Sequence, residues 1–323
     1  MSKNNTFVLQ PSFQCAKECE EFFDNKLKWG PNNNDQLDFI NLFSEKGKNN
    51  LEILKEYIKG KSSRDVEVIN NFLKEEGFDI RLQGGYGPLS FYVAGVFKYA
   101  LEWLRHGSKV VLEQNNDSYK AVMIPSRNVS YEYSSSHQHP FAILKTKNQK
   151  EKVYMTMIDS FPDTWQKALE WISWQKQSLK KGYGGYFVFP QIDYNELGNT
   201  DWIVGLQMFP QNDDLALFYE VVEAVYQTKF KMDEKGAKVE AAAGWGMSGC
   251  SGATLTPYEI NKPFLVWIER EDSEIPIFIG HFGQEDWVKT DDSDNNLDKI
   301  KGKDRSIQTY TNYESCIYNP YEK

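Results

Sequence analysis

The pattern of apolar residues changes once along the chain, near residue 84, and this change limits the possible fold more than any other feature of the sequence. Before it lie three stretches whose apolar residues are spaced for one buried helix face: 15–23, 49–58 and 65–76. After it, short runs rich in β-branched and aromatic residues predominate, and helical patterns return only at 164–178 and 214–225. Helices first and strands later favour an α+β fold with mostly antiparallel sheets over a repeating βαβ fold.

The charge balance and the apolar segments restrict the possible partners. With 46 acidic and 37 basic residues and a net charge of -9, the chain offers no basic patch for a phosphate backbone. The segment nearest to a membrane span, 87–104, contains Lys98 and Glu102. The first residues contain no apolar run of signal-peptide length, and four cysteines are too few for a disulfide framework. We therefore expect a cytoplasmic monomer without nucleic-acid or membrane partners, although secretion by another route stays open.

Two stretches carry incomplete metal-ligand patterns. Residues 292–303 begin like a calcium loop, but Leu297 stands where that loop needs glycine and Lys303 where it needs glutamate. His137 and His139 could face one way on a strand, yet no further histidine or cysteine lies near them in sequence. The glycine clusters lack the strand–loop–helix setting of a phosphate cradle. The sequence therefore predicts no metal site and no cofactor.

Residues 237–247 alternate like a strand but have an unusual composition. The apolar side of this stretch consists of Ala237, Val239, Ala241, Ala243, Trp245 and Met247. The stretch is rich in glycine and alanine, poor in the β-branched residues that favour a permanent strand, and continues into the small residues of 246–254. This composition indicates a segment that can form a strand without always being one.

The neighbours of this stretch add a recognisable order of motifs. It follows a Lys-Met-Asp-Glu-Lys-Gly-Ala motif at 231–237 and precedes two apolar runs at 261–268 and 277–280. This order resembles the hinge, reactive loop and C-terminal strand pair of the serpins, a family of protease inhibitors. The resemblance is strong in this region, is looser upstream, and spans about residues 5–284.

In the looser part, three segments resemble elements of the large serpin sheet and its surroundings. Residues 93–98, with Trp103, resemble the central strand of that sheet, and 187–194 resemble a later strand. Residues 202–206 resemble the helix after that strand. The resemblance thus implies an α+β serpin-like fold with a large central mixed sheet, two further β-sheets, helices mainly from the N-terminal part and an exposed reactive loop.

The resemblance also implies a domain division and a function. The serpin-like domain would cover residues 1–285, with the reactive loop at about 237–259, and 286–323 would form a polar, disordered tail. The chain would be a suicide inhibitor of serine or cysteine proteases, with no catalytic residue of its own. The reactive bond would be Cys250-Ser251. The implied hinge residues are Glu234, Gly236, Ala237, Val239, Ala241, Ala242 and Ala243.

Departures from the family pattern leave other functions open. The chain lacks the first serpin helix, and 205–234 is compressed. A buried polar cluster of the family is replaced by Gln10, Phe13, Val93 and Tyr226. A non-inhibitory protein whose loop is cleaved without trapping is therefore an alternative. A third reading is a hydrolase with Cys250 as nucleophile and His281, the only downstream histidine, as base.

Overall fold

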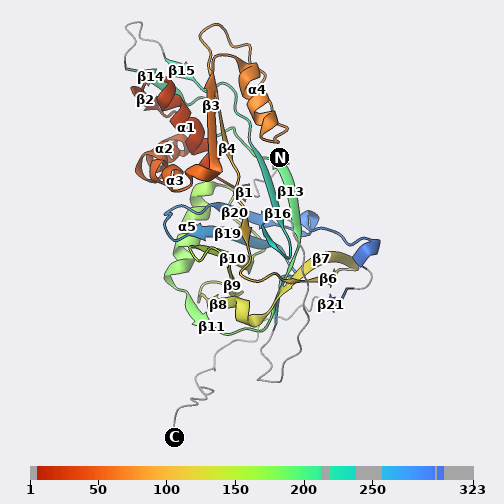
Figure 1. Ribbon diagram of the computed structural model, residues 1–323. Helices are drawn as coiled ribbons and strands as arrows, with labels where there is room; N and C mark the ends of the chain where they lie inside the picture. Colours follow the sequence, from red (N-terminus) through yellow and green to blue (C-terminus); the bar gives the residue numbers. More distant parts are fainter. Residues whose placement is uncertain (1–5, 212–217, 238–256, 295–296, 302–323) are drawn as a thin grey trace.

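The computed structural model describes residues 6–211, 218–237, 257–294 and 297–301, and most helices gather at one end of the molecule (Figure 1). The helices are α1 (Gln10–Phe22), α2 (Asn34–Leu42), α3 (Lys48–Ile53), α4 (Val66–Glu75) and α5 (Trp165–Gln177). Side chains of Asn33 and Asp65 cap the N-termini of α2 and α4. The expectation that helices come mainly from the N-terminal part is confirmed.

The largest sheet has seven strands and is antiparallel throughout, in the order β1-β20-β19-β10-β9-β8-β11. Its strands, in that order, are Thr6–Phe7, Phe278–Phe282, Phe264–Arg270, Glu151–Met157, Phe141–Lys145, Val129–Tyr133 and Lys180–Gly182. Helix α5 packs Ala168 and Ile172 against one face, where Trp267 is fully buried. The opposite face contributes to the main core.

The five-stranded sheet faces the seven-stranded sheet across the main core. Its order is β18-β12-β7-β6-β21, and the two outer strands run parallel to their neighbours. These strands are Tyr258–Glu259, Phe187–Pro190, Asp117–Ile124, Ser108–Gln114 and Lys299–Lys301. The α+β class, with one large sheet and further sheets, is therefore confirmed, although the largest sheet is antiparallel and not mixed, and the described residues form five further sheets and not two.

Four small sheets complete the architecture. Strand β3 (Ile58–Ser63) pairs with β4 (Tyr92–Phe97), and β13 (Ile192–Leu197) pairs with β16 (Gln227–Met232), in both cases antiparallel. The others are β2 (Leu27–Gly30) with β14 (Gln207–Pro210) and β15 (Tyr219–Glu220), and β5 (Leu101–Glu102) with β17 (Gly236–Ala237). The segment expected at the centre of a large sheet, 93–98, thus lies in a two-stranded ladder.

Several local expectations are wrong. The strand expected at 187–194 is divided at Gln191 between β12 and β13, which belong to different sheets. The helix expected at 202–206 is a series of turns, with hydrogen bonds such as Ile203 N to Thr200 O (3.1 Å). The described part of the helix expected at 214–225 is not helical either, because Tyr219–Glu220 pairs with β14 and three valines disfavour a helix there.

The tail expected from residue 286 is not separate from the domain at its start. Trp287 is buried in the main core, and Thr290 N donates a hydrogen bond to Ser118 O (3.1 Å). Strand β21 then extends the five-stranded sheet. Its many charged residues made this segment resemble a disordered tail, although Asp294 is buried and pairs with Lys120 (3.3 Å), and long-range pairing holds the described part to the domain.

Two paired glycines allow α1 to lie against the β3–β4 ladder. Gly60 and Gly95 are opposite each other in the ladder, and a Cβ on Gly95 would lie 2.1 Å from the Pro11 carbonyl oxygen of α1. Ala94 and Val96, on the other face of β4, pack against Ile69 and Leu73 of α4. Helices α1 and α4 therefore cover opposite faces of β3 and β4.

We predict that Gly95→Ala lowers the free energy of unfolding by about 1–3 kcal/mol, because the added methyl group must displace the α1 backbone. Urea unfolding of the purified variant measures the change. Lys61→Ala, at an exposed position of β3 in the same ladder, should change stability by no more than about 0.5 kcal/mol. Equal stability of Gly95→Ala and the wild type would contradict the close packing of α1.

Candidate functional site

Among the described residues, strands β4 and β16 each have a partner strand on one edge only. Strand β4 pairs with β3 and β16 with β13, and no backbone hydrogen bond joins β4 to β16 in the part of the chain that the structure describes. In an antiparallel ladder, alternate residues direct their N–H and C=O groups away from the partner strand. Both strands therefore present backbone donors and acceptors on their free edges.

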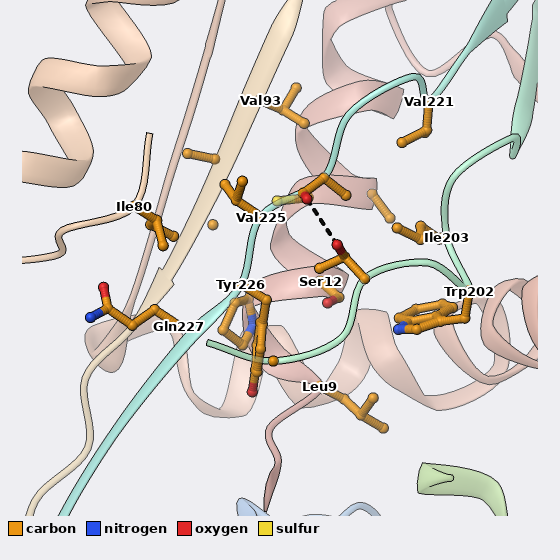
Figure 2. A pocket seen from close by; sticks show the side chains of 18 of the residues that line it. Leu9, Ser12, Ile80, Val93, Trp202, Ile203, Val221, Val225, Tyr226 and Gln227 are labelled. Carbon is orange, nitrogen blue, oxygen red and sulfur yellow. Dashed lines mark hydrogen bonds between the residues drawn. The ribbon is translucent and has the colours of Figure 1, made fainter. Parts of the chain in front are cut away.

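A cavity of about 1400 Å³ lies between the two strand pairs, and both free strands contribute to its lining (Figure 2). Val93 of β4 lies on one side of it, and Tyr226, just before β16, and Gln227, the first residue of β16, lie on the other. Residues of α1, including Ser12, form its floor. We call this space the gap. Its position between two free strand edges makes it a place where a further strand could pair on both sides.

Strands β4 and β16 run in the same direction along the gap. After β4, the chain forms β5, and β5 pairs with β17, which follows β16 after a short turn. The C-terminal ends of both strands therefore meet at one end, which we call the hinge end. A strand that turned back from β17 into the gap would be antiparallel to both neighbours.

Trp103 fixes the hinge end. Its indole Nε1 donates to Asp233 O (2.9 Å) and its backbone N to Lys235 O (3.0 Å), and the ring is buried. Glu234 forms an ion pair with Lys109 (3.3 Å), and its carbonyl accepts from Gly107 N (2.7 Å). These contacts hold the turn between β16 and β17 in place.

The predicted hinge residues lie partly in this region. Gly236 has a φ of 153°, and a Cβ there would be 2.2 Å from Leu101 O, so glycine is required. Ala237 pairs with Leu101 in the β5–β17 ladder. The other named loop residues, Val239, Ala241, Ala242, Ala243, Cys250 and Ser251, lie outside the described residues, so their roles stay predictions. The described chain resumes with β18 at the edge of the five-stranded sheet.

The four residues expected to replace a polar cluster, Gln10, Phe13, Val93 and Tyr226, do not form one group. Val93 and Tyr226 line the gap, whereas Gln10 and Phe13 are not among its lining residues. Phe13 stacks on Phe39 at a centroid distance of 5.5 Å in the helical core. The Tyr226 hydroxyl accepts from Val8 N and donates to Val8 O, both at 3.2 Å. Burial raises the pKa of Tyr226 to about 12, so the hydroxyl remains neutral at physiological pH.

The histidines considered as a catalytic base or as metal ligands lie against neighbouring protein groups in the fold. His281 lies in β20, and its Nε2 is 3.0 Å from Ile158 O. His137 Nε2 is 2.9 Å from the Thr156 hydroxyl, and burial lowers the pKa of His137 to about 4. Within the described residues, no group of three or more histidine, cysteine and acidic side chains could hold a metal ion. No described helix is long and apolar enough to span a bilayer.

Sequence reasoning missed the connector between α4 and β4, residues 77–91, which also lines the gap. Phe78, Ile80 and Leu82 of this connector pack against the cluster formed by α4 and β4. Their alternation along the sequence was an available signal, but a single extended segment without a ladder has no distinctive composition.

Comparison with known proteins identifies the architecture. No protein-family model matches the sequence, and no curated protein matches it. The native structure of Tengpin, a thermophilic serpin, matches with a TM-score of 0.55 at 13% identity, covering 88% of this chain and 89% of that one. The chain has the fold of a serpin.

Two further solved serpin-fold structures agree with this likeness. Serpin48 of the insect Tenebrio molitor, described as a highly specific serpin, has a TM-score of 0.52 at 10% identity and covers 87% of this chain and 92% of its own. The mouse protein-Z dependent protease inhibitor has a TM-score of 0.52 at 12% identity, and the match covers 87% of this chain and 91% of the inhibitor.

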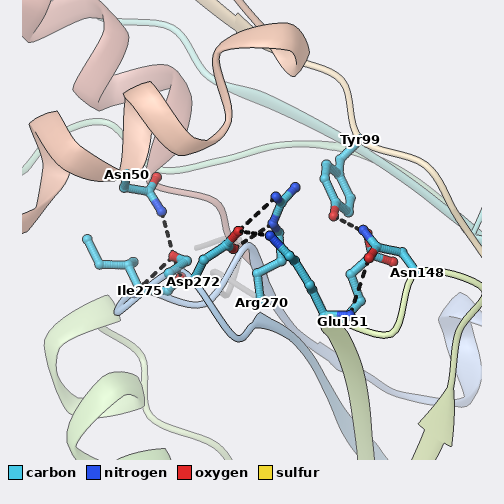
Figure 3. Close-up of polar contacts among 9 residues, drawn as sticks. Asn50, Tyr99, Asn148, Glu151, Arg270, Asp272 and Ile275 are labelled. Atoms are coloured by element: carbon cyan, nitrogen blue, oxygen red, sulfur yellow. Dashed lines mark hydrogen bonds and ion pairs between the residues drawn. The ribbon is translucent and has the colours of Figure 1, made fainter.

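In this serpin fold, both sides of the gap are anchored near the hinge end. On the β4 side, the Tyr99 hydroxyl bonds to Glu151, which also accepts from Asn148 Nδ2 at 2.7 Å (Figure 3). On the β16 side, Phe230 stacks on Phe278 of β20 at a centroid distance of 4.2 Å. Both strand pairs are therefore attached to the seven-stranded sheet.

We predict that Trp103→Phe lowers the free energy of unfolding by about 1–3 kcal/mol, since it removes the buried N–H donor to Asp233 O. The measurement is urea unfolding. Trp174→Phe provides the control, because Trp174 is 55% exposed and its loss should cost no more than about 0.5 kcal/mol. If the two substitutions had the same small effect, the indole N–H would not stabilise the hinge end.

Proposed function

We propose that the protein is a serpin-like suicide inhibitor of serine or cysteine endopeptidases, and that its cleaved loop inserts into the gap between β4 and β16. The single observation that carries this proposal is the pair of free strand edges on one cavity, with the start of the loop at the hinge end. The serpin fold supports the same conclusion.

The protease would attack the loop as a substrate and form an acyl-enzyme through its own serine or cysteine. We place the reactive bond at Cys250-Ser251, where small residues suit a shallow primary pocket. The freed segment would then turn back at Gly236 and enter the gap antiparallel to both strands. The attached protease would be carried along and distorted before deacylation.

Insertion is favourable because the new strand would gain partners on both edges. Each net ladder hydrogen bond contributes about 0.5–1.5 kcal/mol. The side chains at 237, 239, 241 and 243, which share one face of the strand pattern, are small, so this face can pack against α1 without overpacking. Glycine and alanine in the loop keep it from forming a stable strand before cleavage.

A second candidate is a non-inhibitory protein whose loop is cleaved without trapping. The specific observation in its favour is Tyr226, which ties the start of β16 to Val8 through two hydrogen bonds and so resists separation of the strand pairs. The hydrolase alternative has no comparable support, because its nucleophile, Cys250, lies outside the described residues and His281 contacts a backbone carbonyl.

We predict that a protease accepting small side chains forms a covalent complex with the wild type that survives denaturing electrophoresis. Ala241→Arg should be cleaved without trapping, since an unpaired charge on the inward side of the inserted strand costs several kcal/mol. Glu240→Gln, on the opposite face of the same strand, adds no charge and should still trap. Equal trapping by both variants would contradict the proposed register.

Mass spectrometry of the released fragment should find its N-terminus within two residues of Ser251.

We also predict that limited cleavage of the loop raises the melting temperature, because the inserted strand adds ladder hydrogen bonds and buries apolar surface. Melting curves of intact and nicked protein, free of protease, provide the measurement. An unchanged melting temperature with complete loop cleavage would favour the non-inhibitory alternative.

A further inference from the structure

The connector between α4 and β4, residues 77–91, covers the gap on the side opposite α1. Phe78, Ile80 and Leu82 all line the cavity and pack with the cluster of Ile69, Leu73, Ala94 and Val96. Because Ala94 and Val96 face α4 and Gly95 faces α1, the connector and α1 lie on opposite faces of β4. A strand that enters the gap must therefore run beneath the connector.

The start of the connector is held against the β3–β4 pair by ion pairs. Glu76, at the end of α4, accepts from Lys59 Nζ of β3 (2.6 Å) and from Lys98 Nζ just after β4 (2.7 Å). These hydrogen bonds lower the pKa of the Glu76 carboxyl, so it is ionised throughout the physiological range. Together with the apolar packing of α4, these hydrogen bonds attach the connector to the β3–β4 pair.

The connector contacts β16 through Asp79. Asp79 N donates to Gln227 Oε1 (2.9 Å), and the Asp79 carboxylate accepts from Lys229 Nζ (2.9 Å). Lys229 Nζ also donates to Gly77 O (2.9 Å). These contacts cross from the connector to β16 without any backbone ladder between the two segments.

Glu223, in the segment before β16, forms a second fastening. Its carboxylate accepts from Gln83 N (2.8 and 3.0 Å), Gly84 N (3.4 Å) and the Tyr86 hydroxyl (3.1 Å). Gly84 and Gly85 have φ values of 74° and 83°. This left-handed turn, which favours glycine, directs consecutive N–H groups at one carboxylate.

We propose that Asp79 and Glu223 are positioning residues that clamp the two strand pairs together and set the rate at which the gap accepts a strand. Widening the gap moves β16 and the segment before it away from β4, whereas the connector stays with β4. The polar contacts of these two carboxylates must therefore break or rearrange before a strand can reach the end of the gap distant from the hinge. This inference rests on the proposed function, because it concerns the same gap.

The test uses the intact, uncleaved protein and a synthetic peptide of the loop sequence 237–247 in place of the protein's own strand. Stable peptide uptake is followed by native mass spectrometry over time. We expect the double variant Asp79→Ala, Glu223→Ala to take up the peptide at least tenfold faster than the wild type. The control Glu170→Ala removes an exposed carboxylate on α5 and should leave the rate unchanged.

The outcomes separate the clamp from the proposed function. Uptake at the same rate by wild type and double variant would overturn the clamp while leaving insertion intact. No uptake by either protein would contradict insertion into the gap and the clamp with it. Glu223→Gln keeps the acceptor atoms but loses the charge, so it should give a smaller acceleration. The urea unfolding midpoint of each variant shows whether it folds. If the double variant does not fold, the test uses Glu223→Gln alone. Faster peptide uptake by Glu223→Gln than by the wild type then supports the clamp, and an unchanged uptake rate overturns it.

Discussion

Within the part of the chain that the structure describes, the free edges of β4 and β16 leave backbone N–H and C=O groups without a partner strand, and the arrangement of the neighbouring elements follows from this constraint. Backbone polar groups that are removed from water without a partner cost free energy, so two such edges can face each other only across a space that stays accessible or becomes filled by a strand. The cavity of about 1400 Å³ provides that space. Helix α1 and the connector enclose it on opposite faces.

The two ends of the gap are held by different kinds of interaction. At the hinge end, buried rings of Trp103 and Phe230 hold both strand pairs to the rest of the molecule. At the other end, the carboxylates of Asp79 and Glu223 contact the connector near solvent. Buried apolar contacts are costly to break, whereas partly exposed polar contacts exchange readily with water. The structure can therefore open far from the hinge without exposing its core.

The sequence was sufficient for the parts of the fold that depend on local periodicity. The amphipathic stretches contain α1, α4 and α5, because their apolar residues define one buried face. Only the first half of 49–58 is helical, as α3, since Lys55–Tyr57 forms a 3-10 turn and β3 begins at Ile58, and α2 was not predicted. Long-range pairing decided the rest. Nothing local at Gln191 shows that its flanking strands enter different sheets, and the valines of 221–225 fit an extended segment as well as a helix face. The contacts of Asp79 and Glu223 could not be predicted from the sequence either, since Glu223 and Gln83 are distant in sequence and come together only in the folded chain.

The central claim is that the cleaved loop occupies the gap between β4 and β16. Hydrogen exchange of the backbone amides of these two strands, measured by mass spectrometry before and after loop cleavage, tests it most directly. Insertion predicts that amides on the free edges of Tyr92–Phe97 and Gln227–Met232 exchange much more slowly after cleavage, while β9 and β10 in the seven-stranded sheet are unchanged. Equal or faster exchange of β4 and β16 in the cleaved protein would contradict the account.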